Sequence, residues 1–139
     1  MLLVLGVTVG VMWWDRGAPP GFRPPVEDVT VETINREHRG VRLQGTAHNE
    51  ARLKQTISGS DEVWWLIPLF AKGDTISREV RVLVRTPTAP DGFYGFEDRT
   101  LEGFARPPGS LLPRQARSAL KKKGYSIADD AVLVEEWVD

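Results

Sequence analysis

Residues 79–85 have the sequence Glu-Val-Arg-Val-Leu-Val-Arg, which is the clearest strand pattern in the chain. Val80, Val82 and Val84 recur at every second position, which is typical of a β-strand with one buried face. Valine is also branched at Cβ and favours the extended backbone. We therefore expect a strand that buries Val82 and exposes Arg81.

Shorter runs with the same period lie on both sides of this stretch, with turn residues between them. The alternating positions are Val29, Val31 and Thr33, then Val41 and Leu43, then Leu53, Gln55 and Ile57. The first two runs are either separate strands or one bent strand, and Ser-Gly-Ser-Asp at 58–61 predicts a hairpin turn. Many short strands separated by turns predict a mainly β protein, here a small antiparallel β-barrel or OB-like domain.

Residues 63–70, Val-Trp-Trp-Leu-Ile-Pro-Leu-Phe, are apolar throughout. A strand of this kind is buried on both faces, or it buries one face and turns the other toward a partner or lipid. Pro68 cannot donate a main-chain hydrogen bond and predicts a bulge or a sheet edge. Because neighbouring strand residues point to opposite faces, one of Trp64 and Trp65 is expected in the core. The other is expected at a surface that binds a partner or the membrane.

A long ordered loop is expected at 86–98, where three aromatic residues gather. Phe93, Tyr94 and Phe96 would extend the surface of the apolar strand. Together with the two tryptophans they form the predicted partner-binding site, because a small barrel cannot bury this much apolar surface internally. A further strand is expected at 100–105.

The C-terminal part of the chain changes to helical spacing. After Arg-Pro-Pro-Gly at 106–109, which is expected to close the barrel, Ser110 is the predicted N-cap and Gly124 the predicted end of one helix. Apolar residues recur at Leu112, Ala116, Ala119 and Leu120. The lysines at 121–123 suit the negative end of the helix dipole; this interpretation is favoured over a polyanion site, and a contact with anionic lipid remains open. A last strand is expected at 131–134.

The chain opens with an apolar run at 1–12 that ends in Trp13-Trp14 and then Asp15-Arg16. Tryptophans at the end of an apolar helix are typical of a membrane interface, so residues 1–14 are predicted to be a single-pass membrane anchor helix. Such a helix spans only about 21 Å of a hydrocarbon layer of about 30 Å. A start further upstream, a thinned bilayer, a cleaved signal peptide and a buried soluble helix are the alternatives.

Residues 15–28 contain clustered prolines and glycines, which favour an extended, semi-rigid spacer; an SH3-type ligand is the alternative. The 139 residues are thus divided into an anchor at 1–14, a spacer at 15–28 and one β-barrel domain at 29–139. The domain is expected on the extracytoplasmic side of the membrane.

The composition argues against several functional classes. A net charge of −1 argues against a nucleic-acid-binding protein, which would normally carry a basic surplus. The absence of cysteine excludes disulfides, thiol chemistry and cysteine-ligated zinc. The motifs of serine hydrolases and phosphate-binding loops are absent too. We therefore expect no enzymatic activity, no catalytic residue, no metal and no bound cofactor.

Two histidines, His38 and His48, are the candidate ligands for a metal or haem. Each lies beside a turn, where an exposed or capping histidine is the more common finding. The adjacent carboxylates at 129–130 and 135–136 are not expected to form an acid–base pair, because neighbouring side chains of a strand point in opposite directions.

A series of short motifs resembles one known family. In chain order they are V-x-L-x-G at 41–45, I-P-L at 67–69, V-L-V-R at 82–85 and L-x-G-x-x-R-x-P at 101–108. With the N-terminal apolar segment, this order resembles the Surfeit-locus family of cytochrome oxidase assembly factors. The resemblance implies a membrane-anchored small β-barrel that faces away from the cytoplasm, and no haem-related residue is carried over. The pattern is also similar to that of the GIDE-type membrane-anchored domains.

The expected function is a membrane-tethered, non-enzymatic interaction or assembly module that acts on a membrane protein complex. The resemblance implies respiratory oxidase biogenesis as its setting. The alternative is a ligand-binding barrel for haem or another apolar cofactor, lined by Trp64 or Trp65 and one histidine.

Overall fold

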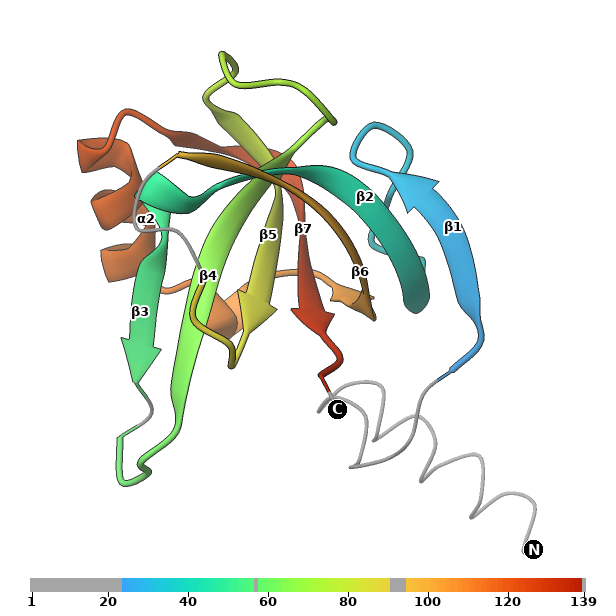
Figure 1. Cartoon of the computed structure of the whole chain (residues 1–139). Helices are drawn as coiled ribbons and strands as arrows, with labels where there is room; N and C mark the ends of the chain where they lie inside the picture. Colours follow the sequence, from blue (N-terminus) through green and yellow to red (C-terminus); the bar gives the residue numbers. More distant parts are fainter. Residues whose placement is uncertain (1–23, 57, 91–94, 139) are drawn as a thin grey trace, which may run out of the picture.

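The computed structural model describes residues 24–56, 58–90 and 95–138, which form a β-barrel with one helix against its outer wall (Figure 1). In chain order the elements are β1 (Val26–Thr30), β2 (Gly40–His48), η1 (Asn49–Ala51), β3 (Leu53–Thr56), β4 (Val63–Phe70), β5 (Glu79–Thr86), β6 (Phe96–Arg106), η2 (Gly109–Leu111), α2 (Arg114–Lys122) and β7 (Ser126–Glu136). The prediction of a mainly β protein with a small barrel and one C-terminal helix is confirmed.

Five strands close the barrel in the order β2, β4, β5, β7 and β6, with β6 returning to β2. Closure is completed where β2 pairs with β4 at Thr46 with Phe70 and Ala47 with Leu69. Four of these pairings are antiparallel, but β5 and β7 run parallel, so the prediction of an entirely antiparallel barrel was wrong. The parallel pair is possible because β6 and α2 lie between β5 and β7 in the chain and provide the crossover.

Two further strands extend the sheet beyond the closed barrel. β1 pairs in parallel with β2 only, and β3 pairs antiparallel with β4 only, among the described strands. The runs that contain Val29 and Val41 therefore belong to separate strands, not to one bent strand, but β1 ends at Thr30, and Val31 and Thr33 lie in the turn that follows it, so their expected place in a strand was wrong. In Figure 1, β1 begins and β7 ends at the bottom of the barrel, which we call the lower end; the opposite rim, at His48 and Phe70, is the upper end.

The barrel has an inner core and an outer core on the two sides of its wall. The inner core is aliphatic and consists of Val31, Val41, Leu43, Ala47, Ile67, Leu69, Val82, Val84, Leu101, Ala105, Val132 and Val134. The outer core lies under α2 and consists of Ala51, Leu66, Phe70, Val80, Leu83, Leu112, Leu120, Tyr125 and Leu133. β4 contributes to both cores, which explains why its sequence is apolar on both faces. Val82 is fully buried and Arg81 is exposed, as the period of β5 predicts. The expectation of a single buried face was wrong: Val80 lies in the outer core with the fully buried Leu83, because the pairing of β5 with β7 shifts between Val80 and Val82.

Pro68 occupies a point where β4 changes neighbour on one side. Residues 63–66 pair with β3, and residues 69–70 pair with β2. On its other side Pro68 is paired with Leu83 of β5. Pro68 therefore lies between the part of β4 that pairs with β3 and the part that pairs with β2, and it stands at a change of partner strand and not at an outer edge of the sheet.

Two motif glycines let the strands approach closely enough to close the barrel. A Cβ at Gly45 would lie 2.5 Å from the Phe70 carbonyl oxygen, and a Cβ at Gly103 would lie 2.3 Å from the Glu135 carbonyl oxygen. Both distances are shorter than van der Waals contact permits. Glycine at these positions marks close approach of one backbone to another, as is common where a barrel wall bends.

Several expected element boundaries were wrong. β6 begins at Phe96, not at residue 100, and β7 begins at Ser126, not at residue 131. The barrel is not closed at 106–109, because β7 supplies its fifth strand after the helix. Pro113, not Ser110, precedes α2, since residues 109–111 form a short 3-10 turn of their own. Gly124 ends the helix with a positive φ of 91°, as predicted.

The predicted anchor at 1–14 and most of the predicted spacer at 15–28 lie outside the described residues. Within the described ranges, none of the helices combines the length and the apolarity that a membrane crossing requires.

Candidate interaction surfaces

Three tryptophans gather at the lower end of the barrel. Trp64 and Trp65 stand near the start of β4, and Trp137 follows the last residue of β7. All three are half-buried, and Val138 beside them is 44 % exposed. This end also receives the chain at Pro24 and Pro25, before β1. We call these four residues, Trp64, Trp65, Trp137 and Val138, the tryptophan end.

Trp64 covers a buried charged pair on the outer wall. The guanidinium carbon of Arg85 lies 3.9 Å from the centre of the Trp64 ring, within the range of a cation–π contact. Arg85 is only 6 % exposed and donates to Glu135 Oε1 at 2.6 Å and to Gln55 Oε1 at 3.3 Å. Gln55 in turn donates to the Leu111 carbonyl at 3.1 Å. Trp64 was predicted from the sequence as a site residue, but this network was not. It connects β3, β4, β5, β7 and η2.

Trp65 points the other way and packs against the inner core. The two tryptophans therefore face opposite sides of β4, as the strand period requires. Neither is fully exposed: Trp65 lies at the lower mouth of the barrel, and Trp64 lies over Arg85 on the outside.

Phe96 lies at the opposite rim from Trp64. It is 47 % exposed and contacts the ring of His48 edge-on at 4.8 Å, and His48 stacks on Phe70 at 4.1 Å. Trp64 and Phe70 are six residues apart in one strand, which corresponds to about 20 Å. The structure therefore does not bring Phe96 and the tryptophans into one patch. Phe93 and Tyr94 lie outside the described residues.

His48 is fully buried, in contrast to the exposed or capping role expected of it. Its Nε2 lies 2.8 Å from the Asp74 carbonyl and its Nδ1 lies 3.0 Å from the Tyr125 hydroxyl. The carbonyl can only accept, so Nε2 carries the proton and Tyr125 donates to Nδ1. Burial lowers the pKa of His48 from its ordinary 6.5, and the cation of Arg78 acts in the same direction, against the hydrogen bond to Asp74.

Three of the four ring nitrogens of the two histidines are hydrogen-bonded within the fold. Both ring nitrogens of His48 are hydrogen-bonded. His38 Nδ1 accepts from the Asn35 N–H at 3.1 Å, and its Nε2 lies 3.5 Å from Glu27, so His38 has the capping role that was expected. In the part of the chain that the structure describes, no three His, Cys, Asp or Glu side chains gather in a way that could hold a metal ion.

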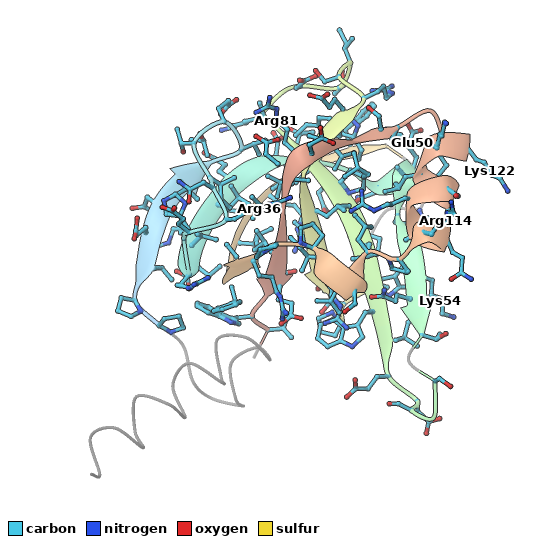
Figure 2. The ribbon with its side chains drawn as sticks, turned by 180° about the vertical axis from the view of Figure 1, so that it is seen from behind. Arg36, Glu50, Lys54, Arg81, Arg114 and Lys122 are labelled. Atoms are coloured by element: carbon cyan, nitrogen blue, oxygen red, sulfur yellow. The ribbon has the colours of Figure 1, made fainter. Side chains whose placement is uncertain are left out.

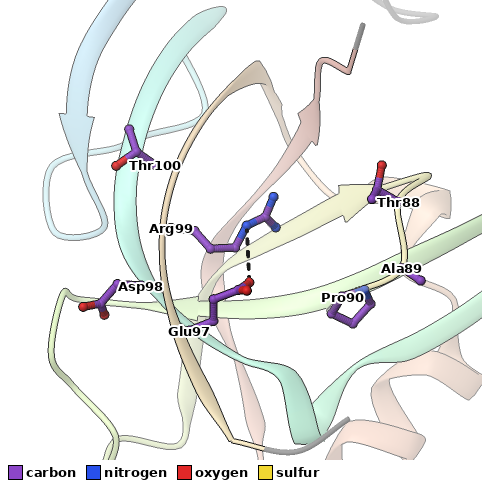
Figure 3. A pocket seen from close by; sticks show the side chains of 7 residues that line it. All are labelled: Thr88, Ala89, Pro90, Glu97, Asp98, Arg99 and Thr100. Atoms are coloured by element: carbon purple, nitrogen blue, oxygen red, sulfur yellow. Dashed lines mark ion pairs between the residues drawn. The ribbon is translucent and has the colours of Figure 1, made fainter. Parts of the chain in front are cut away.

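A polar cleft of about 320 Å³ lies between the segment after β5 and the first half of β6 (Figure 3). Its most conspicuous group, Arg99, lies 3.8 Å from Glu97 and donates to both carboxylate oxygens of Glu136 at 2.8 and 2.7 Å. Asp98 accepts from the Thr46 hydroxyl at 2.7 Å. These groups are already paired within the fold, and a charged lining of this kind does not suit an apolar cofactor.

Helix α2 carries the strongest local charge of the chain. Residues 114–123 contain five cations and no acid, so the rest of the chain has a net charge of −6. None of the five forms an ion pair with a described residue, and Lys123 donates to the Glu50 carbonyl at 3.3 Å. Figure 2 shows Arg114 and Lys122 on the same side of the molecule as Lys54 of β3. The lysine run is visible in the sequence, and its place at the end of α2 suits the helix dipole, as expected.

Comparison with protein-family models, with curated proteins and with solved structures finds no match to this chain.

Proposed function

We propose that the protein is a membrane-tethered, non-enzymatic interaction or assembly module that acts on a membrane protein complex. The tether is the apolar segment 1–14, and the acting part is an OB-like barrel. The strand order supports the term OB-like, since that fold is a five-stranded Greek-key barrel. Biogenesis of a respiratory oxidase is the setting that the sequence resemblance implies.

The observation that carries this proposal is the tryptophan end. Tryptophan is enriched at protein interfaces and in the headgroup region of membranes, because its ring is apolar and its N–H is polar. Trp64, Trp65 and Trp137 gather at the end where the chain that follows residues 1–14 enters the barrel. A tether at this end would hold the three rings close to a membrane-embedded partner.

The filled interior of the barrel supports an external binding surface. The inner core occupies the space in which a lipocalin-like barrel would hold its ligand. For the alternative function, carriage of haem or another apolar cofactor, the aliphatic side chains would have to be displaced. No observation of the described residues favours that alternative.

Co-purification of the full-length protein in mild detergent tests the proposal. A stoichiometric membrane protein partner is expected, and capture should fall in a Trp137→Ser variant. Phe96→Ser is the matched control, because it removes an exposed aromatic ring at the opposite rim. Loss of capture with Phe96→Ser alone would move the interface to the upper end, and a bound chromophore without a protein partner would favour the carrier function.

Deletion of residues 1–14 tests the tether separately. The shortened protein is expected to remain folded and to leave the membrane fraction. If the full-length protein is soluble without detergent, or if the deletion unfolds the barrel, the segment belongs to the core and the tether is wrong.

A further inference from the structure

We propose a second binding site, a groove between α2 and the free edge of β3 that takes an extended acidic segment of a partner protein. This inference goes beyond the proposed function, because it concerns a different surface and does not depend on the tether or on the tryptophan end.

The groove has a volume of about 330 Å³ and an apolar floor. Leu53 and Leu66 line it from the strands, and Ala116 and Ala119 line it from the helix. Alanine at two successive turns keeps this side of α2 narrow and leaves room beside it. Such dimensions suit a peptide better than a flat bilayer surface, which would not enter the groove.

The groove lies over the outer face of β3, where Leu53 is paired with Leu66 of β4, and it also reaches the edge of β3. All four residues of β3, 53–56, line the groove, although successive side chains of a strand point to opposite sides. That edge is unpaired, since β3 pairs only with β4 among the described strands. Its main-chain groups can therefore accept one more strand, the mode of recognition known as β-augmentation.

The charges around the groove select an acidic occupant. Lys54 lines the groove, and Lys122 stands one turn beyond Ala119 on the same side of α2. Arg114 lies nearby at the start of the helix (Figure 2). None of the cations on α2 forms an ion pair with a carboxylate of the described residues, so glutamates or aspartates of a bound segment could pair with them.

The helix dipole accounts for only part of this charge. Lys121 and Lys122 are in the last turn, where cations are favourable, but Arg114 is the first residue of α2, where a cation is unfavourable. No acidic residue occupies the first turn. An arginine in this unfavourable position does not stabilise the helix, and a role in binding an acidic ligand would explain it better.

Binding of a fluorescein-labelled peptide of about ten residues with alternating Glu and Val tests the site, measured by anisotropy with the full-length protein in neutral detergent. Saturable binding that weakens with salt is expected, with none for the matching Lys and Val peptide. An N-methylated peptide should bind at least about tenfold more weakly, because it cannot pair with the strand edge.

Two matched pairs of variants locate the site. Ala119→Gln fills the groove and should weaken binding about tenfold or more, whereas its control Ser118→Gln, next to the groove, should leave binding nearly unchanged. The double variant Arg114→Glu, Lys122→Glu reverses two charges beside the groove and should also weaken binding about tenfold or more. Its control, the double variant Lys72→Glu, Arg81→Glu, makes the same charge change elsewhere and should leave binding nearly unchanged. Equal losses in test and control variants, or no saturable peptide binding, would overturn the proposal. If the peptide does not bind, but the protein binds vesicles that contain anionic lipid and Ala119→Gln does not change this binding, the surface recognises lipid instead.

Discussion

The wall of the barrel and helix α2 both face solvent, but they use their charged side chains in opposite ways. On the wall, Arg42 lies between Asp28 at 3.2 Å and Glu102 at 2.7 Å, and Arg85 and Arg99 each bind a carboxylate of β7. The four cations of α2, Arg114, Arg117, Lys121 and Lys122, form no ion pair with a described residue. The charges of the wall are paired within the fold, whereas those of the helix are not.

The close approach of strands at the wall predicts the largest loss of stability. Gly45→Ala would place a Cβ 2.5 Å from the Phe70 carbonyl at the seam between β2 and β4. The seam would have to open, at a cost of about 3 kcal/mol or more in the free energy of unfolding. Gly59→Ala is the control: its φ of 80° is strained for alanine, but a Cβ there has no neighbour within 4 Å, so about 1 kcal/mol is expected. Similar losses in denaturant titrations of the two variants would show that closure at Gly45 is misassigned.

The buried pair under Trp64 predicts the next effect. Arg85→Met leaves Glu135 without its cation and should cost about 2–4 kcal/mol. Adding Glu135→Leu removes the unpaired carboxylate and should recover much of that loss, because an apolar pair of similar volume is often tolerated. Thermal melts of both variants measure this. If the double variant is less stable than Arg85→Met, the loss in Arg85→Met does not come from the unpaired carboxylate, and Glu135 stabilises the wall even without Arg85.

The buried histidine predicts a dependence of stability on pH. The pKa of His48 is lower in the folded protein than in the unfolded chain, where it is near 6.5. The unfolded chain therefore binds the proton first as the pH falls, so the contribution is fully present above pH 6.5 and is lost progressively below it. The slope should not exceed about 1.4 kcal/mol per pH unit.

His48→Gln is the matched variant for this effect. Glutamine can donate to the Asp74 carbonyl and accept from Tyr125, but it does not titrate. The difference in slope between the two proteins, from melts between about pH 5 and 8, isolates the contribution of His48. Parallel curves would show that His48 takes up its proton in the folded protein as readily as in the unfolded chain.

The alternation of apolar and polar residues was sufficient to predict the strands that fill the barrel. Apolar residues such as Leu43 and Val82 recur at every second position of their strands. The apolar stretch of β4 is buried on both faces, which was one of the two interpretations of its sequence. The start of β6 was not predicted because residues 97–99, Glu-Asp-Arg, are all charged. They belong to the strand because they pair with β2 and because Glu136 neutralises Arg99.

Long-range geometry could not be derived from such patterns. The parallel contact of β5 with β7 depends on the crossover through α2, which leaves no local signal. Trp64 and Phe96 lie at opposite rims because β4 runs the length of the barrel between them. His48 lies just before a turn, yet Phe70 and Tyr125 from distant segments enclose it. Only the motif glycines carried a signal of closure that could have been recognised.

The central question is whether the charges of α2 contribute to the stability of the fold. The free energy of unfolding of an Arg114→Gln, Arg117→Gln double variant answers it. We expect a change within about 0.5 kcal/mol of zero, or a small gain, because one cation is removed from the unfavourable end of the helix dipole and no ion pair is lost. A loss of more than about 1 kcal/mol, with the helix content unchanged, would show instead that these arginines stabilise the fold.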